Sequence, residues 1–124
     1  ILAKKLTDSF FGKVINIHPS LLPKYPGLNT HQKVFDNKDP THGVSIHFVS
    51  SELDSGPLIA QGEIKTKKEE SIESMIQRIH ALEHLIYPRI IKLLCDDKIS
   101  IQMNKVIFNN EYSGVDYIYE HHEI

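Results

Sequence analysis

Three polar side chains occur at positions where, in combination, they could transfer an acyl group. Asn16 and His18 are two residues apart, so on a strand they would point to the same face, and Asp54 follows later in the chain. A histidine carries protons near neutral pH, an asparagine amide donates to an oxyanion, and a carboxylate beside an imidazole favours its charged form. Acyl transfer to an amine needs an acceptor freed of its proton, a stabilised oxyanion and a protonated leaving nitrogen, which these residue types can supply. The three residues alone are equally compatible with a structural role, in which Asn16 and His18 bond to the next loop and Asp54 caps a turn.

The elements around these residues are predicted to present them at one edge of a sheet. Val14, Ile15 and Ile17 are apolar and β-branched, so residues 14–17 are predicted to form a buried strand that stops at His18. Ligands collect outside the carboxyl ends of strands in open α/β sheets, so a site is expected there. Pro23 and Pro26 restrict the backbone of the next segment, which indicates a rigid loop.

The rest of the chain alternates between helix and strand signals. Asn29 or Thr30 could cap a helix that ends near residue 37. Residues 44–49 alternate in a way that predicts a strand with one buried face, and a second strand is expected at 58–65. The loop between these two strands carries Asp54. We therefore predict an α/β fold with a mixed, mostly parallel sheet flanked by helices.

The carboxyl-terminal half contains the clearest helix. Apolar residues recur at helical spacing from residue 72 to residue 94, and Ser71 is a suitable N-cap. Pro88 is expected to kink this helix or split it. Residues 99–108 resemble a hairpin with its turn at Asn104 and Lys105, and residues 1–11 are helix-like.

Composition limits the classes of protein that the chain can belong to. Its 124 residues suit one domain, and 14 basic against 16 acidic residues give a net charge of -2, which does not favour nucleic-acid binding. No apolar run approaches the roughly 20 residues that cross a bilayer. The single cysteine, Cys95, is expected to be a small buried hydrophobic residue, as suits the reducing cytoplasm. Small-molecule partners and a cytoplasmic location are therefore expected, without a nucleic-acid or membrane partner.

Three segments in order resemble the glycinamide ribonucleotide formyltransferase family. They read NIHPSLLPKYPG at residues 16–27, HGVSIHFV at 42–49 and ELDSGP at 52–57, and the resemblance extends over about residues 1–94. It implies that a formyl group passes from 10-formyltetrahydrofolate to the amine of glycinamide ribonucleotide in purine synthesis. The resemblance implies no metal, and the scattered histidines lack compact ligand spacing.

The resemblance also implies roles for individual residues. The catalytic set would be Asn16 as oxyanion donor, His18 as general acid or base, and Asp54 as the carboxylate that acts on His18. The folate pocket would be lined by Ile1, Leu2, Asn16, Ser50, Ser51, Glu52, Leu53 and Asp54. The glycinamide substrate would contact Pro19, His80 and Glu83. His80 and Glu83 are three residues apart and share a helix face, which agrees with the last assignment.

In domain terms, the resemblance implies that residues 1–124 are the catalytic carboxyl-terminal portion of a single formyltransferase domain. The family's amino-terminal half holds the substrate phosphate with a glycine-rich loop, and these residues contain no such pattern. A homodimer is left open.

Three alternative functions remain. A 10-formyltetrahydrofolate deformylase would deliver the formyl group to water, and a noncatalytic fragment would only bind folate. A methionyl-tRNA formyltransferase is disfavoured because Arg-Gly-Ala does not follow the Leu-Leu-Pro of residues 21–23.

Overall fold

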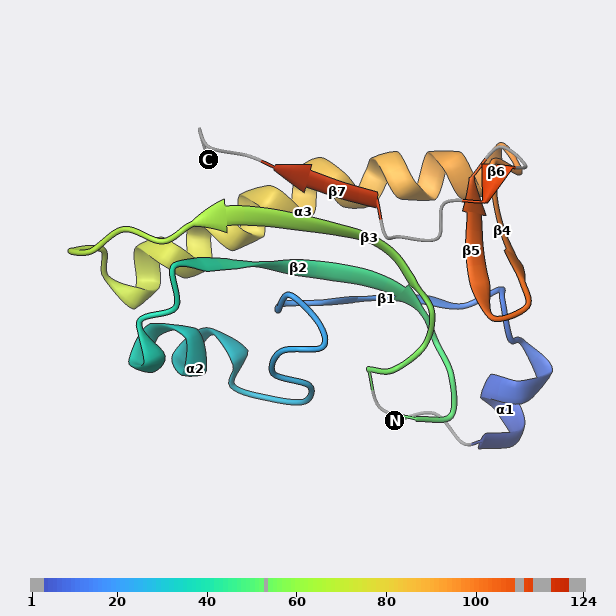
Figure 1. Ribbon diagram of the computed structural model, residues 1–124, viewed down its shortest axis with the longest axis horizontal. Helices are drawn as coiled ribbons and strands as arrows, with labels where there is room; N and C mark the ends of the chain where they lie inside the picture. The colour runs from blue at the N-terminus through green and yellow to red at the C-terminus, as the bar shows by residue number, and fades with distance from the viewer. Residues whose placement is uncertain (1–3, 53, 109–110, 113–116, 121–124) are drawn as a thin grey trace.

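The computed structural model describes residues 4–52, 54–108, 111–112 and 117–120. Figure 1 shows the order of its elements, which are α1 (Lys4–Ser9), β1 (Ile15–His18), α2 (Thr30–Asn37), β2 (Thr41–Phe48), β3 (Leu58–Lys65), α3 (Ile72–Cys95), β4 (Ile99–Gln102), β5 (Lys105–Phe108), β6 (Glu111–Tyr112) and β7 (Tyr117–Glu120). Helices and strands alternate along the first half of the chain, so the α/β prediction is confirmed.

The main sheet has the strand order β1-β2-β3-β7. The β1–β2 and β2–β3 pairs are antiparallel, and only the β3–β7 pair of this sheet is parallel within the described residues. The sheet is mixed as predicted, but the expectation that it is mostly parallel is wrong for the described part. The loop between β2 and β3 simply turns the chain back beside itself, whereas parallel neighbours need a crossover connection.

Strand β2 is buried on both faces, although its alternation predicted one buried face. Every residue of β2 after Thr41 is buried. Helix α3 contacts β2 and β3, and the opposite side is covered by the segment after β1, where the Leu22 amide donates to Ser45 Oγ at 3.0 Å. Polar Ser45 can be buried because it has these partners.

Helix α3 packs its apolar face on the sheet and completes the core. Its N-cap Ser71 accepts a hydrogen bond from the Ser74 amide at 3.1 Å, as the sequence predicted. The helix continues through Pro88, so the predicted split does not occur. Its contact with the sheet is close at Gly62, where an added Cβ would lie 2.9 Å from Leu82 Cδ1. The fully buried core side chains come from β2, β3 and α3, and they are Val44, Ile46, Phe48, Ile59, Ala60, Ile64, Ile79, Leu82, Ile86 and Ile90.

The end of α3 and the segment beyond it differ in detail from the sequence-based expectation. Cys95 is exposed, so its predicted burial is wrong; it is the last residue of the helix. The β4–β5 hairpin forms as predicted, but its turn is at Met103 and Asn104, whose φ angles are 52° and 61°. Two consecutive positive φ angles give the twist that suits a two-residue hairpin.

Candidate active site

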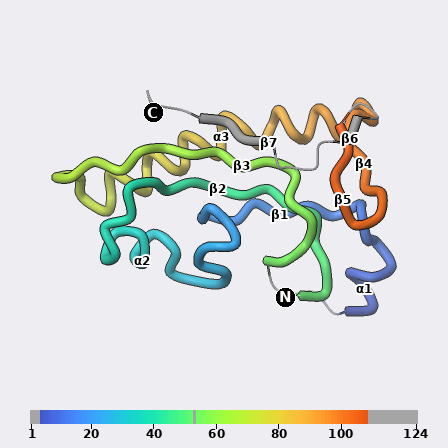
Figure 2. Tube along the Cα trace, in the orientation of Figure 1, coloured from blue at the N-terminus to red at the C-terminus, as the bar shows by residue number. Residues whose placement is uncertain are grey.

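The carboxyl end of β1 and the β2–β3 loop bring His18 and Asp54 together. His18 Nδ1 lies 3.5 Å from Asp54 Oδ2, and the two side chains are only 6% and 7% exposed. Residues 19–29 fold back as a loop between β1 and α2 (Figure 2). A histidine and a carboxylate that are 36 residues apart in sequence, 18 against 54, therefore form one buried pair.

The 19–29 loop braces both members of this pair. His18 Nε2 donates to the Tyr25 carbonyl oxygen at 2.8 Å, because a carbonyl can only accept. The Gly27 amide donates to Asp54 Oδ2 at 2.8 Å. The second ring nitrogen of His18, Nδ1, is thus left to face the carboxylate. This arrangement fixes the orientation of the imidazole ring.

A second histidine, His47, contacts the same carboxylate, and sequence reasoning did not select it. Its Nε2 lies 3.7 Å from Asp54 Oδ1, and its Nδ1 donates to the Phe48 carbonyl at 2.9 Å. The Nε2 atom is buried without a hydrogen bond in the described part of the chain. A signal was available, because His47 is the last residue but one of β2, just before the loop that carries Asp54. Asp54 is therefore shared between two buried imidazoles.

Side chains of strands β2 and β3 form hydrogen bonds with the backbone of the 19–29 loop. Ser45 Oγ donates to the Ser20 carbonyl at 2.7 Å, and Gln61 Nε2 donates to the Leu22 carbonyl at 2.9 Å. Gln61 Nε2 also lies 3.0 Å from Ser45 Oγ. These side chains come from the middle strands β2 and β3, so the sheet itself holds the loop that contacts His18.

Asn16 lies two residues before His18 on β1. It is exposed and lies opposite His47 in the β1–β2 register. At the other side of the site, the Glu52 amide donates to Ser50 Oγ at 3.3 Å. Ser51 and Glu52 are exposed. Asn16, Ser51 and Glu52 of the expected folate set are thus exposed, whereas the side chains of the His18–Asp54 pair are buried. The remaining expected folate residues, Ile1, Leu2 and Leu53, lie outside the described residues.

The expected substrate contacts lie in different surroundings. Pro19 directly follows His18 and is half-buried. Glu83 is half-buried on α3, and its burial raises the pKa of the carboxyl group above 4.5, against the opposing charges of His80 and His84. In the described part of the chain no hydrogen bond or ion pair joins Glu83 to His18 or Asp54.

His80 belongs to another histidine group. Its ring centroid is 6.4 Å from that of His31, and His31 Nδ1 lies 2.9 Å from His42 Nε2. Burial is the main cause that lowers the pKa of His42 to about 4, and burial also lowers the pKa of His31. Within residues 4–52, 54–108, 111–112 and 117–120, no group of three histidine, cysteine or acidic side chains is placed to hold a metal ion. No described helix is both long enough and apolar enough to span a membrane.

Comparison with known proteins decides the family. A family model described as formyl transferase matches residues 1–91. The chain belongs to the formyl transferase family. The family resemblance carried by residues 16–27, 42–49 and 52–57 is therefore confirmed. The His18–Asp54 pair lies within the matched part of the chain.

Two bacterial relatives of the chain share the name phosphoribosylglycinamide formyltransferase. The chain is 41% identical over 104 residues to phosphoribosylglycinamide formyltransferase of Escherichia coli, with 84% of this chain and 49% of the relative covered. It is 42% identical to the enzyme of the same name in Haemophilus influenzae, with the same coverage. The chain thus spans about half the length of the curated relatives that it matches.

Solved structures agree with the family assignment. Phosphoribosylglycinamide formyltransferase of Coxiella burnetii, solved with CHES, has a TM-score of 0.91 and 37% identity, and covers 96% of this chain and 56% of its own. A formyltetrahydrofolate deformylase of Pseudomonas syringae has a TM-score of 0.82 and 29% identity, and covers 87% of this chain and 36% of its own. The transferase structure is the more similar of the two.

Proposed function

We propose that this chain carries the formyl-transfer centre of a phosphoribosylglycinamide formyltransferase. The reaction would move the formyl group of 10-formyltetrahydrofolate to the amine of glycinamide ribonucleotide in de novo purine biosynthesis. The observation that carries the proposal is the buried pair of His18 Nδ1 and Asp54 Oδ2 at 3.5 Å, in a chain of this family. The proposal includes the sequence-based expectations of metal-free catalysis and a cytoplasmic enzyme, and leaves a homodimer open.

The chemistry follows from the positions of the three catalytic candidates. The substrate amine attacks the formyl carbon, and the Asn16 amide donates to the oxygen that becomes negatively charged. His18 takes a proton from the attacking amine and returns one to the folate nitrogen as it leaves. Because Asp54 can accept a hydrogen bond from Nδ1–H, the neutral ring would hold its proton on Nδ1 once substrate replaces the Tyr25 carbonyl. The unprotonated Nε2 would then take the proton from the amine and pass it to the leaving nitrogen.

Asp54 acts on the histidine rather than on the substrate. Its Oδ2 atom is fixed by the Gly27 amide at 2.8 Å while it faces His18, so its charge supports the imidazole at the moment when the ring takes a proton. The folate would enter over the exposed Ser51 and Glu52. Glu83 would accept a hydrogen bond from the substrate amine, as the family resemblance implies.

A deformylase is the second candidate, because a formyltetrahydrofolate deformylase shares this fold at a TM-score of 0.82. The same His18 and Asp54 would then activate water instead of an amine. A noncatalytic folate-binding chain is the third candidate.

One assay separates these functions. Tetrahydrofolate release from 10-formyltetrahydrofolate is followed by absorbance, with and without glycinamide ribonucleotide. The proposal predicts release only when the ribonucleotide is present, and a fall of at least roughly a hundredfold in His18→Ala. Release without the ribonucleotide would make the protein a hydrolase. Folate binding without release under either condition would leave only the binding function.

A further inference from the structure

A cavity of about 740 Å³ is lined by residues other than the His18–Asp54 pair. It is formed where the end of α2, the start of β2 and the connection from β3 to α3 meet, which is the end of the sheet opposite the β2–β3 loop (Figure 1). His18 pairs with Ser45 of β2, five residues along the chain from Pro40 of the cavity, so the two are roughly 17 Å apart along the strand. The volume falls within the range of small-molecule sites.

The floor of this cavity is apolar. Val34 of α2 and Met75 of α3 line it and are only 3% and 2% exposed, whereas Phe35 is 40% exposed. The exposed phenyl ring provides apolar area to which a ligand could add cover. The cavity can therefore accept the apolar body of a ligand.

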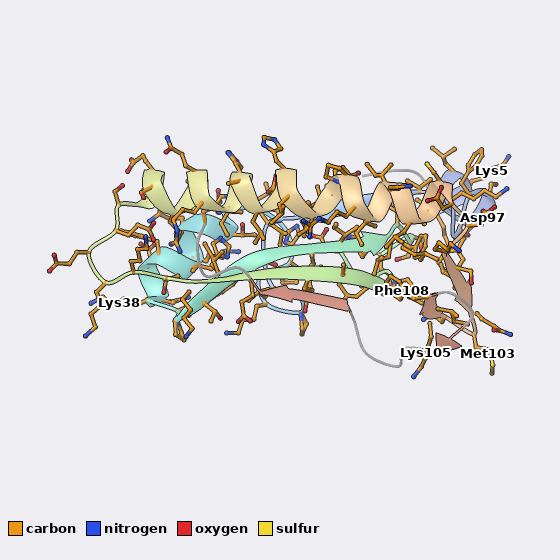
Figure 3. The ribbon with its side chains drawn as sticks, turned by 90° about the horizontal axis from the view of Figure 1, so that it is seen from above. Lys5, Lys38, Asp97, Met103, Lys105 and Phe108 are labelled. Atoms are coloured by element: carbon orange, nitrogen blue, oxygen red, sulfur yellow. The ribbon has the colours of Figure 1, made fainter. Side chains whose placement is uncertain are left out.

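The rim of the cavity is positively charged. It is lined by four lysines, which are Lys38, Lys65, Lys67 and Lys68. Figure 3 shows Lys38 at the end of the molecule opposite Lys5. Since the chain as a whole has a net charge of -2, this concentration of lysine is local.

Two of the three carboxylates that line the cavity are already engaged. Glu70 Oε1 pairs with Arg78 Nη1 at 2.7 Å, and Asp39 Oδ2 accepts from the Tyr25 hydroxyl at 2.7 Å. Only Glu69 offers a carboxylate with no such partner in the described part of the chain. The lysines are therefore available to an external anion.

Hydrogen bonds hold the walls of the cavity in place. Thr66 Oγ1 donates to the Asp39 carbonyl at 2.6 Å, and the Thr66 amide donates to the Pro40 carbonyl at 3.1 Å. Arg78 Nη2 donates to the Lys65 carbonyl at 2.8 Å. These bonds join the start of β2, the end of β3 and α3, so the shape of the cavity does not depend on a ligand.

We propose that this cavity is a second ligand site, which binds a small organic anion. The apolar body of the anion would lie on Phe35 and Met75, and the lysines of the rim would hold its charged group. The site is separate from the proposed formyl-transfer centre and does not depend on that function.

The test is a titration of the full chain with 2-naphthyl phosphate, followed by amide chemical shifts. Saturable shifts are expected in residues 34–40 and 65–70. The variant Lys67→Ser/Lys68→Ser is expected to weaken binding on the order of tenfold, because two charges near the anion are lost. The matched control Lys5→Ser/Lys98→Ser removes two exposed lysines elsewhere and should leave binding unchanged.

Two further ligands test separately whether the apolar body and the charge of the ligand contribute to binding. Inorganic phosphate lacks the apolar body, and 2-naphthol lacks the charge, so each should bind more weakly than 2-naphthyl phosphate. Equal binding of 2-naphthol, an equal loss in both lysine pairs, or shifts confined to the exposed Leu6, Phe10 and Phe11 would overturn the proposal.

Discussion

Two pairs of histidines lie at different places along β2. In one pair a carboxylate contacts both rings, and in the other pair the two rings contact each other. His47, near the end of the strand, shares the Asp54 carboxylate with His18, at distances of 3.7 Å and 3.5 Å. His42, near its start, contacts the His31 ring directly at 2.9 Å. Burial lowers the pKa of His42 to about 4, and the charge of Asp39 offsets only part of this effect.

The comparison shows that the groups beside a buried histidine decide whether its ring can carry a proton. The imidazoles beside Asp54 have a negative charge within reach that can support a proton in transit. His31 and His42 have chiefly each other, so their burial favours the neutral rings. The first group is suited to proton transfer, and the second group is suited to a role in stability.

Asp54→Asn should have the largest effect, because it removes the charge that distinguishes the two groups. The Asn carbonyl oxygen can still accept from the Gly27 amide, so the loop keeps its main contact. Formyl transfer is expected to fall on the order of a thousandfold, within the range of general acid–base effects. Turnover and thermal unfolding are measured together. A fall below tenfold would remove Asp54 from the mechanism.

Acid stability tests the His31–His42 group. Folding lowers the pKa of His42 from its ordinary value of 6.5 to about 4, so the unfolded chain binds more protons between these two values. The stabilisation is complete above pH 6.5 and is lost as the pH falls to about 4, by roughly 3 kcal/mol. Urea unfolding at pH 7 and pH 4 measures this loss.

His42→Gln should reduce this pH dependence, whereas His84→Gln, at an exposed position, should not. If both variants lose stability in acid as the parent chain does, the burial of His42 has no role in acid unfolding.

His47→Gln should have a smaller effect than Asp54→Asn on formyl transfer. His47 faces Asp54 and not the substrate in the proposed mechanism, so it is a positioning residue. We expect kcat to fall about tenfold, because the contact of His47 Nε2 with Asp54 Oδ1 at 3.7 Å is lost, with KM little changed. The pH dependence of kcat should also move, which a purely structural defect would not cause. A change in KM alone would contradict the assignment.

The smallest expected effect is a shift in the pKa of the Glu83 carboxyl group. Its burial raises the pKa above 4.5, while the charges of His80 and His84 lower it. A carboxyl ¹³C titration should therefore place the Glu83 midpoint above 4.5. His80→Gln and His84→Gln should each raise it further. A midpoint at or below 4.5 in the parent chain would show that burial is not the largest effect on the pKa of Glu83.

Local patterns predicted the elements better than their pairing. The apolar spacing of α3 and its cap at Ser71 act within a few residues, and β3 begins and ends at the predicted residues 58 and 65. The direction of β1 relative to β2 depends on how the intervening 22 residues return, from 19 to 40, which no local pattern encodes. The expected parallel order was wrong for this reason.

In the candidate site, too, the residues within local motifs were predicted and the long-range contacts were not. The Asn16–His18 spacing and the family motifs selected His18 and Asp54 before any fold was known. The alternation of β2 made His47 look like an ordinary strand residue, because its contact with Asp54 depends on the path of the β2–β3 loop. The network of Ser45 and Gln61 was missed because its hydrogen bonds span 16 to 39 residues of sequence.

The most direct test of the central claim compares formyl transfer in two matched variants, His18→Gln and His31→Gln. The account predicts that His18→Gln lowers turnover by at least roughly a hundredfold, while His31→Gln leaves it within about twofold of the parent. An equal loss in both variants, or a greater loss in His31→Gln, would show that the carboxylate-linked histidines are not the chemical centre.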